Sequence, residues 1–97
     1  MAPTTSTQAT FWIPSMLRVY CGGAAELVIP GGTVGAALDE LERRFDSLHR
    51  NIRDETGAVR RHVNIFVNSD NIRDRDGLGT RLEPGDTVTI LPSVSGG

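Results

Sequence analysis

Lysine is absent from this chain of 97 residues, and all ten of its basic side chains are arginines. A bias in genome composition is the simplest origin of this pattern. Whatever its origin, the absence excludes several kinds of chemistry. No lysine can reach the phosphates of a P-loop nucleotide, form a Schiff base or accept an isopeptide bond. Chains of this protein linked through its own lysines are therefore impossible.

Cysteine, long apolar runs and clustered positive charge are also scarce. Cys21 stands alone and cannot form an internal disulfide, so nothing indicates an oxidising compartment. No apolar run is long enough to cross a membrane, and the first ten residues lack the basic start and apolar centre of a signal peptide. The formal net charge is −2, which argues against nucleic acid as a partner. Together these absences predict a cytoplasmic protein of one domain.

The first half of the chain predicts two strands followed by a helix. We expect residues 1–9 to form a disordered polar lead-in and residues 10–92 to form the folded domain. Residues 11–20 predict extended chain interrupted at Pro14, and residues 25–29 predict a second strand after the Gly22-Gly23 turn. Thr33 is a favoured helix N-cap. One amphipathic helix ending between residues 48 and 53 is predicted by the apolar stripe Val34, Leu38, Leu41, Phe45 and Leu48.

The second half of the chain predicts further strands. Residues 62–68 alternate in polarity, with Val63, Ile65 and Val67 on one face. Residues 87–91 predict the last strand, which begins after a Pro-Gly turn and ends at Pro92. One helix can cover one face of a small sheet. The order of elements therefore predicts an α+β domain of the β-grasp (ubiquitin-like) class. We expect a mixed sheet of four to five strands packed on one helix, with the final strand at its centre.

The predicted tail, residues 93–97, ends in Gly96-Gly97. A carboxylate is a poor electrophile until it becomes an acyl-adenylate, after which sulfide or persulfide can convert it to a thiocarboxylate. Glycine lacks a Cβ, so two terminal glycines give a slim chain that fits a narrow enzyme channel. We interpret Gly97 as the modified residue and Val94, Ser95 and Gly96 as the segment that enters the channel. A frayed end without function is the alternative.

Three stretches carry a resemblance to a known family: residues 13–18, 63–68 and 85–97. Along nearly its whole folded length the chain resembles the ThiS/MoaD family of sulfur carriers. Within that family it looks most like the CysO branch, which carries sulfur for cysteine biosynthesis. The resemblance implies the same ubiquitin-like fold and the adenylation and thiocarboxylation of Gly97. It also implies a carrier rather than an enzyme.

The same resemblance implies particular partners. A ubiquitin-activating-type adenylyltransferase/sulfurtransferase would use ATP to activate Gly97. A cysteine synthase dependent on pyridoxal phosphate would accept the sulfur, and a metallopeptidase would release the product. Neither ATP nor pyridoxal phosphate would be bound by this chain. Relatives that serve molybdenum cofactor biosynthesis also end in Gly-Gly, so the small subunit of molybdopterin synthase remains an alternative.

Outside the tail, a few side chains are candidates for partner binding or for chemistry. Phe66 and Leu91 are expected on the sheet face away from the helix and, with Pro92, are predicted to form a partner docking patch. Cys21, His49 and His62 match no metal-ligand spacing, so neither a metal site nor a catalytic group is predicted. An iron–sulfur site is excluded because it needs four cysteines. The residues before the helix, 30–33, are expected to form a structural turn rather than an anion site.

Two further classes of function remain open at this point. In a pure binding module the sheet would dock a partner and the tail would be inert. In a protein modifier, Gly97 would be joined to lysines of other proteins.

Overall fold

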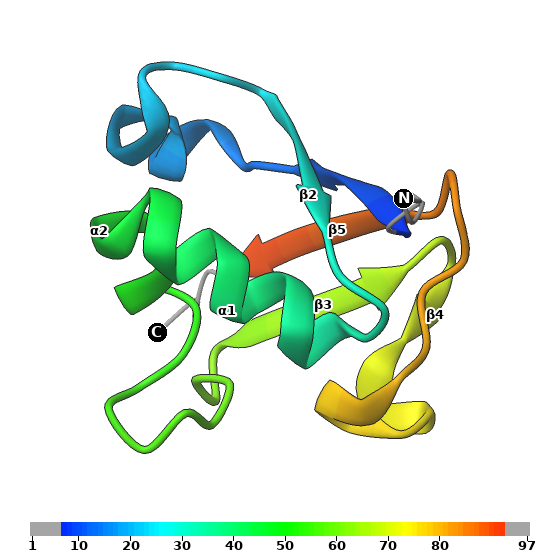
Figure 1. Ribbon diagram of the computed structural model, residues 1–97. Helices are drawn as coiled ribbons and strands as arrows, with labels where there is room; N and C mark the ends of the chain where they lie inside the picture. The colour runs from blue at the N-terminus through cyan, green and yellow to red at the C-terminus, as the bar shows by residue number, and fades with distance from the viewer. Residues whose placement is uncertain (1–6, 93–97) are drawn as a thin grey trace.

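The computed structural model describes residues 7–92. Its centre is a five-stranded sheet in the order β2-β1-β5-β3-β4, and helix α1 (Val34–Arg44) crosses one face of that sheet (Figure 1). The strands are β1 (Gln8–Trp12), β2 (Glu26–Pro30), β3 (Val63–Val67), β4 (Asp70–Asn71) and β5 (Thr87–Pro92). The predicted β-grasp fold, with its final strand at the centre, is confirmed.

Strand β5 is paired unequally on its two sides. Antiparallel pairing with β3 runs along the whole of β3, from Val63↔Pro92 to Val67↔Val88. Parallel pairing with β1 covers three residues and stops at Trp12↔Thr89. Beyond Thr89, the described residues provide no strand on the β1 side. The chain turns away after Trp12, where Pro14 has no N–H to donate to a ladder.

The core lies between the sheet and α1. Alternation along β3 and β5 turns Val63, Ile65, Val67, Val88 and Ile90 inward, and all five are buried. The helix stripe of Val34, Leu38 and Leu41 is completely buried against them. Each such side chain contributes roughly 1.5–3 kcal/mol by burial. Thr33 caps the helix as predicted, since its Oγ1 accepts a hydrogen bond from the N–H of Ala36 at 3.1 Å.

The predicted single helix is in fact two. Helix α1 ends at Arg44, and α2 (Asp46–Arg50) follows after Phe45, whose φ of −141° is not helical. The apolar stripe still continues across the break, because Leu48 on α2 is fully buried. The Phe45 N–H keeps a bond to the Leu41 carbonyl at 2.7 Å, so the chain bends without losing that bond. No glycine or proline marks the position in the sequence.

The N-terminal region also departs from the prediction. Residues Ser15–Cys21 form a 3₁₀ helix, η1, and not extended chain, because this turns Leu17 and Cys21 into the core. Strand β1 begins at Gln8, so the last two residues of the predicted lead-in, Gln8 and Ala9, belong to the sheet. Residues 1–6 lie outside the described part of the chain.

Two short 3₁₀ helices, η2 (Ile72–Asp74) and η3 (Gly77–Gly79), connect β4 to the segment before β5. Gly22 and Gly23, at the predicted turn, both have positive φ values of 71° and 87°, which glycine adopts without steric cost. Within residues 7–92, no helix is both long enough and apolar enough to span a membrane.

Candidate docking site at the end of strand β5

The predicted reactive tail begins where the central strand ends. Pro92 is the last residue of β5 and lies opposite Val63 of β3. Residues 93–97 lie outside the described part of the chain, so the roles of Val94, Ser95, Gly96 and Gly97 stay predictions. What the structure provides is their attachment point. A strand paired along its whole length on one side is a rigid base for a functional group.

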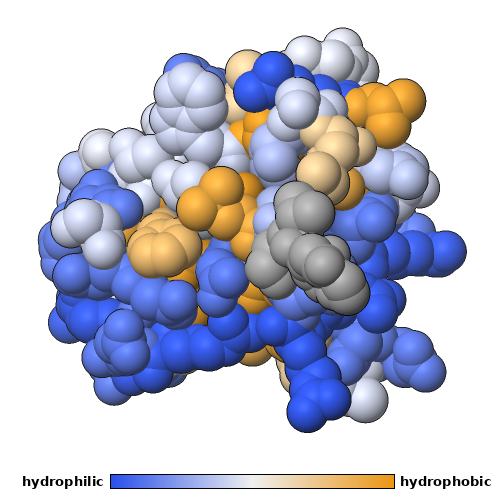
Figure 2. Space-filling model, turned by 180° about the vertical axis from the view of Figure 1, so that it is seen from behind, coloured by the Kyte–Doolittle hydropathy of each residue, from blue (hydrophilic) through white to orange (hydrophobic). Residues whose placement is uncertain are grey.

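The sheet face opposite α1 carries two of the three predicted patch residues. Leu91 is 47% exposed and lies opposite Asn64, while Phe66 is half-buried and lies opposite Thr89. Directly opposite residues in a sheet share a face, so Leu91 and Phe66 are diagonal neighbours. Pro92 lies opposite Val63, which faces the core, so the structure places it on the other face. Figure 2 shows apolar side chains gathered on this open face among hydrophilic ones.

A groove lies beside Leu91, and the sequence alone did not reveal it. It is a shallow cavity of about 270 Å³ lined by Trp12, Ile13, Pro14, Arg18, Thr87, Thr89, Ile90 and Leu91. It forms because β1 leaves the sheet after Trp12 and η1 bends away from β5. Trp12 is 42% exposed and lies opposite Thr89. The alternation of Trp12 with buried Phe11 and Ile13 was the available signal for its outward position.

Arg18 forms the charged wall of this groove. Its Nε donates to the Ile13 carbonyl oxygen at 2.9 Å, which holds the half-buried side chain in place. Tryptophan and arginine are the residue types that dominate binding at protein interfaces, and the exposed Leu91 adds apolar surface beside them. The site can therefore dock a protein surface next to the emerging tail.

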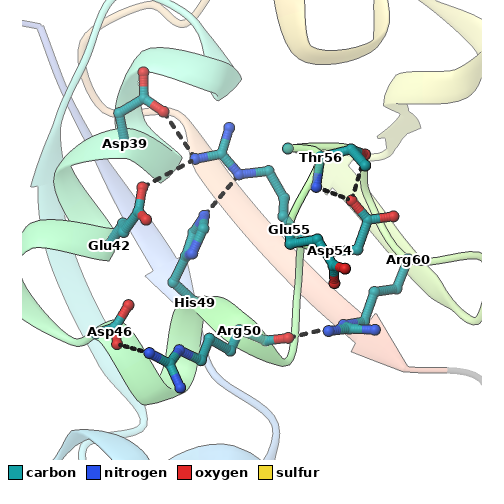
Figure 3. A pocket seen from close by; sticks show the side chains of 11 residues that line it. Asp39, Glu42, Asp46, His49, Arg50, Asp54, Glu55, Thr56 and Arg60 are labelled. Carbon is teal, nitrogen blue, oxygen red and sulfur yellow. Dashed lines mark hydrogen bonds and ion pairs between the residues drawn. The ribbon is translucent and has the colours of Figure 1, made fainter.

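A larger hollow of about 650 Å³ lies on the helix side, between α1, α2 and the loop of residues 54–60 (Figure 3). The buried Arg53 donates from Nε to His49 Nε2 at 2.7 Å and from Nη2 to Asp39 Oδ1 at 2.8 Å. Because His49 Nε2 accepts that bond, its imidazole is neutral. The pKa of His49 is lowered, first by burial and then by the Arg53 charge.

This hollow holds a group of ligand-type atoms, since Glu42, Asp46 and His49 bring theirs within 4.8 Å of one another. The lone pair of His49 Nε2 is already used by Arg53, whose Nη2 also lies 4.0 Å from Glu42 Oε1. Arg53 thus supplies positive charge to Glu42, while Asp46 pairs with Arg50 at 2.9 Å. We interpret the cluster as a structural link between α1, α2 and Arg53, which lies three positions after the end of α2.

Other candidate residues have structural roles. Cys21 is buried, and its Sγ contacts the Ala24 carbonyl oxygen at 3.4 Å. Among residues 7–92, no cluster of three metal-ligand side chains includes Cys21 or His62. At the turn before α1, a Cβ on Gly31 would lie 2.6 Å from the Ala37 nitrogen. Close packing of the turn on the helix therefore explains Gly31.

A mixed five-stranded sheet in this order, with helix α1 across one face, is the β-grasp fold, which defines the ubiquitin-like class of protein. The model of the ThiS family matches residues 19–97. Sulfur carrier protein CysO of Mycobacterium tuberculosis is 39% identical over 90 residues, which covers 91% of this chain and 97% of the relative. The chain therefore belongs to the ThiS family.

Solved structures agree with this placement. The crystal structure of Mycobacterium tuberculosis CysO matches with a TM-score of 0.82 and 38% identity, covering 89% of this chain and 99% of that one. CysO in the BexX/CysO complex of Amycolatopsis orientalis matches with a TM-score of 0.81 and 36% identity, covering 92% and 99%. Small archaeal modifier protein 3 of Haloferax volcanii is a more distant relative, 40% identical over 65 residues, which covers 67% of this chain and 70% of that protein.

Proposed function

We propose that this protein is a sulfur carrier for cysteine biosynthesis, and that the Gly97 carboxylate is the group that carries the sulfur. The observation that supports this most is a combination of two features. The chain shares the fold of CysO and is 39% identical to it over 90 residues, and three residues separate Gly96-Gly97 from Pro92, the last residue of the central strand. The chain itself is a substrate and not an enzyme.

The proposed chemistry has two steps on an activating enzyme. The Gly97 carboxylate attacks the α-phosphate of ATP, pyrophosphate leaves, and an acyl-adenylate forms. Hydrosulfide then attacks the acyl carbon and AMP leaves, which produces the thiocarboxylate. ATP is bound by the activating enzyme and not by this chain. Glycine at the last two positions keeps the acyl carbon free of steric hindrance.

In the next proposed reaction the thiocarboxylate sulfur replaces the leaving group of an activated serine derivative held by pyridoxal phosphate on a partner synthase, which forms a thioester between the carrier and the new cysteine. The amino group of that cysteine then attacks the thioester carbonyl, which frees the thiol and forms an amide. A metallopeptidase hydrolyses the amide, which releases cysteine and restores the Gly97 carboxylate. Both enzymes need access to the same tail, so each must dock the carrier near the end of β5. The absence of lysine supports this role, because the activated carbonyl has no lysine of its own chain to acylate.

Intact mass spectrometry tests the proposal. The protein is incubated with ATP, the activating enzyme and sulfide, beside a matched variant that lacks Gly97. The full chain should gain about 16 Da, since one carboxylate oxygen is replaced by sulfur. The shortened chain should gain nothing. An unchanged mass of the full chain, in a reaction where a known carrier is converted, would overturn the proposal.

A second candidate function is protein modification, which is supported by the similarity to an archaeal modifier protein. In that case the Gly97 carbonyl is transferred to lysines of other proteins. Conjugates would then contain one copy of this protein at each site, because the chain offers no lysine for a second. Gel analysis of cells that express a tagged chain would show discrete heavier bands that disappear with the Gly97 deletion.

A further inference from the structure

The ten arginines divide into two groups by their partners. Five form ion pairs with carboxylates within 4.0 Å: Arg43, Arg44, Arg50, Arg53 and Arg75. The other five have no carboxylate partner among residues 7–92: Arg18, Arg60, Arg61, Arg73 and Arg81. In a chain with net negative charge, five cations without a carboxylate partner need an explanation.

Three of the unpaired arginines flank the end of β5. Arg18 lines the same groove as Leu91. On the other side of β5, Arg73 donates from Nη1 to Asn64 Oδ1 at 2.7 Å and from Nη2 to the Val63 carbonyl oxygen at 2.9 Å. Asn64 and Val63 are the residues opposite Leu91 and Pro92.

Arg61 is exposed and precedes Val63 by two positions, at the same end of the sheet. We call Arg18, Arg61 and Arg73 the exit arginines, because they surround the point where the tail leaves the sheet. Their charges lie on both sides of the exposed Leu91.

The remaining unpaired arginines lie elsewhere. Arg60 turns to the helix side and donates to the Arg50 carbonyl oxygen at 2.8 Å (Figure 3). Arg81 lies beside Thr33, at the start of α1. Acids lie at both ends of the sheet. Asp86, at the end opposite the tail, bonds to Asn68 at 3.1 Å. The exposed Glu26 at the tail end lies opposite Trp12 and forms no ion pair with the arginines among residues 7–92. Positive charge without a carboxylate partner is therefore concentrated at the tail end of the sheet.

Unpaired surface charge of this kind acts at a distance. At physiological ionic strength the field of an exposed charge extends about 8 Å before screening, and complementary charges orient two proteins before contact. Because no carboxylate of the described residues neutralises the exit arginines, their charge is available to a partner. The exposed Trp12 and Leu91 provide the apolar centre that such an interface needs.

We propose that the exit arginines, with Trp12 and Leu91 at their centre, dock onto an acidic protein surface with an apolar centre, located around the channel that receives the tail. The partner surface is that of the activating enzyme, so the inference rests on the proposed function. The arginines orient the carrier, and the apolar contact holds it while Gly97 reaches ATP.

The test compares two triple variants with the same change in charge. One replaces the exit arginines (Arg18→Gln, Arg61→Gln, Arg73→Gln), and the control replaces ion-paired arginines (Arg43→Gln, Arg44→Gln, Arg75→Gln). The KM and kcat for thiocarboxylate formation are measured at low and at physiological ionic strength. The exit variant should raise KM by about tenfold at low salt with little change in kcat, and should flatten the salt dependence. The control should stay within about twofold of the parent protein.

A second variant guards against misfolding, since Arg73 also bonds to the backbone of β3. The double variant Arg18→Gln, Arg61→Gln keeps those bonds and should still raise KM and reduce the salt dependence. This inference is overturned, and the proposed function stands, if both triple variants have the same KM. The same conclusion follows if the KM of the parent protein does not depend on ionic strength while thiocarboxylate forms normally. If the parent protein forms no thiocarboxylate, the proposed function fails and the inference fails with it. If sedimentation shows that the exit variant disrupts self-association instead, the acidic partner is a second copy, and the inference is also overturned.

Discussion

The two faces of the sheet use their polar and charged groups in opposite ways. On the helix side, Arg53 is buried and bonds to both His49 and Asp39, so charge and hydrogen bonds are satisfied within the protein. On the open side, Arg18 and Arg73 bond to carbonyl or amide oxygens and form no ion pair with a carboxylate of residues 7–92. Trp12 and Leu91 are also exposed there. The helix side therefore stabilises the fold, and the contrast supports the proposal that the open side docks a partner.

Cavity size alone would have led to the opposite assignment. The hollow beside α2 is more than twice the volume of the groove beside Leu91, at about 650 against 270 Å³. The larger hollow is lined mostly by charged side chains that are engaged with one another. The smaller one has an apolar centre and lies next to the end of β5, after which the segment proposed to carry the chemistry follows in the sequence.

The largest expected effect comes from the tail. Adding one alanine after Gly97 should abolish thiocarboxylate formation, because the carboxylate is displaced and a Cβ is placed beside the reacting carbon. The melting temperature should stay unchanged, because the buried core described above lies within residues 9–90. Intact mass spectrometry and thermal unfolding measure the two effects. Thiocarboxylate on the extended chain, or a lower melting temperature, would contradict the account.

A negative charge introduced at the end of β5 on the open face should lower activity without lowering the stability of the fold. Leu91→Asp should lower kcat/KM for thiocarboxylate formation by about 30-fold, as expected for an interface residue worth about 2 kcal/mol. Val28→Asp is the matched control, since Val28 is 55% exposed on the same sheet but lies on the edge strand β2. Kinetic assays compare kcat/KM of the two variants, and the loss should be confined to Leu91→Asp. Equal losses would show that the whole face, and not the end of β5, contacts the partner.

Removing the buried Arg53 guanidinium should lower the stability of the fold without lowering activity. Arg53→Ala leaves the buried His49 Nε2 without its donor, so the free energy of unfolding should fall by about 2 kcal/mol. The folded fraction should still form thiocarboxylate at the parental rate. Arg50→Ala is the control, because Arg50 forms an exposed pair with Asp46, and its loss should cost no more than about 0.5 kcal/mol. Urea unfolding measures both values. A selective loss of activity in Arg53→Ala would show that the helix side also contributes to activity.

The smallest expected effect is on the dependence of folding stability on pH. The pKa of His49 is lowered in the folded protein, so the unfolded state takes up the proton first as pH falls. The stability from neutral His49 is complete above about pH 6.5, the unfolded value, and is lost as pH falls from there through the lowered folded pKa. His49→Gln keeps an acceptor for Arg53 but cannot titrate, so this part of the pH dependence should disappear. Unfolding curves at pH 7 and pH 5 give the change in unfolding free energy with pH. If that change is the same in the variant, other groups cause it.

Much of the fold could be predicted because its signals are local and consistent. The period-two pattern around Val63 and Ile65 and the capped stripe from Thr33 to Leu41 agree with the structure. The break at Phe45 could not be predicted, because the apolar spacing continues through it into α2. Helix η1 was missed because β-branched and aromatic residues suggested a strand, although Leu17 and Cys21 at a spacing of four were a helical signal.

The site was partly predictable as well. Phe66 and Leu91 were placed on the open face by alternation, and the structure bears that placement out. Pro92 was expected beside them, but the same alternation puts it on the core side, opposite Val63. Which arginines lack carboxylate partners depends on contacts between segments far apart in the chain, as between Arg73 and Asn64. Such contacts leave no pattern in the sequence.

An NMR titration of the ¹⁵N-labelled protein with the activating enzyme locates the docking surface directly. If the partner docks at the end of β5, shifts or broadening are expected for the Trp12 indole and for the amides of Asn64, Phe66, Thr89 and Leu91, with little change along α1 and α2. Changes centred on His49 and Arg53, with the open face unaffected, would contradict this docking site and make the helix side the functional surface.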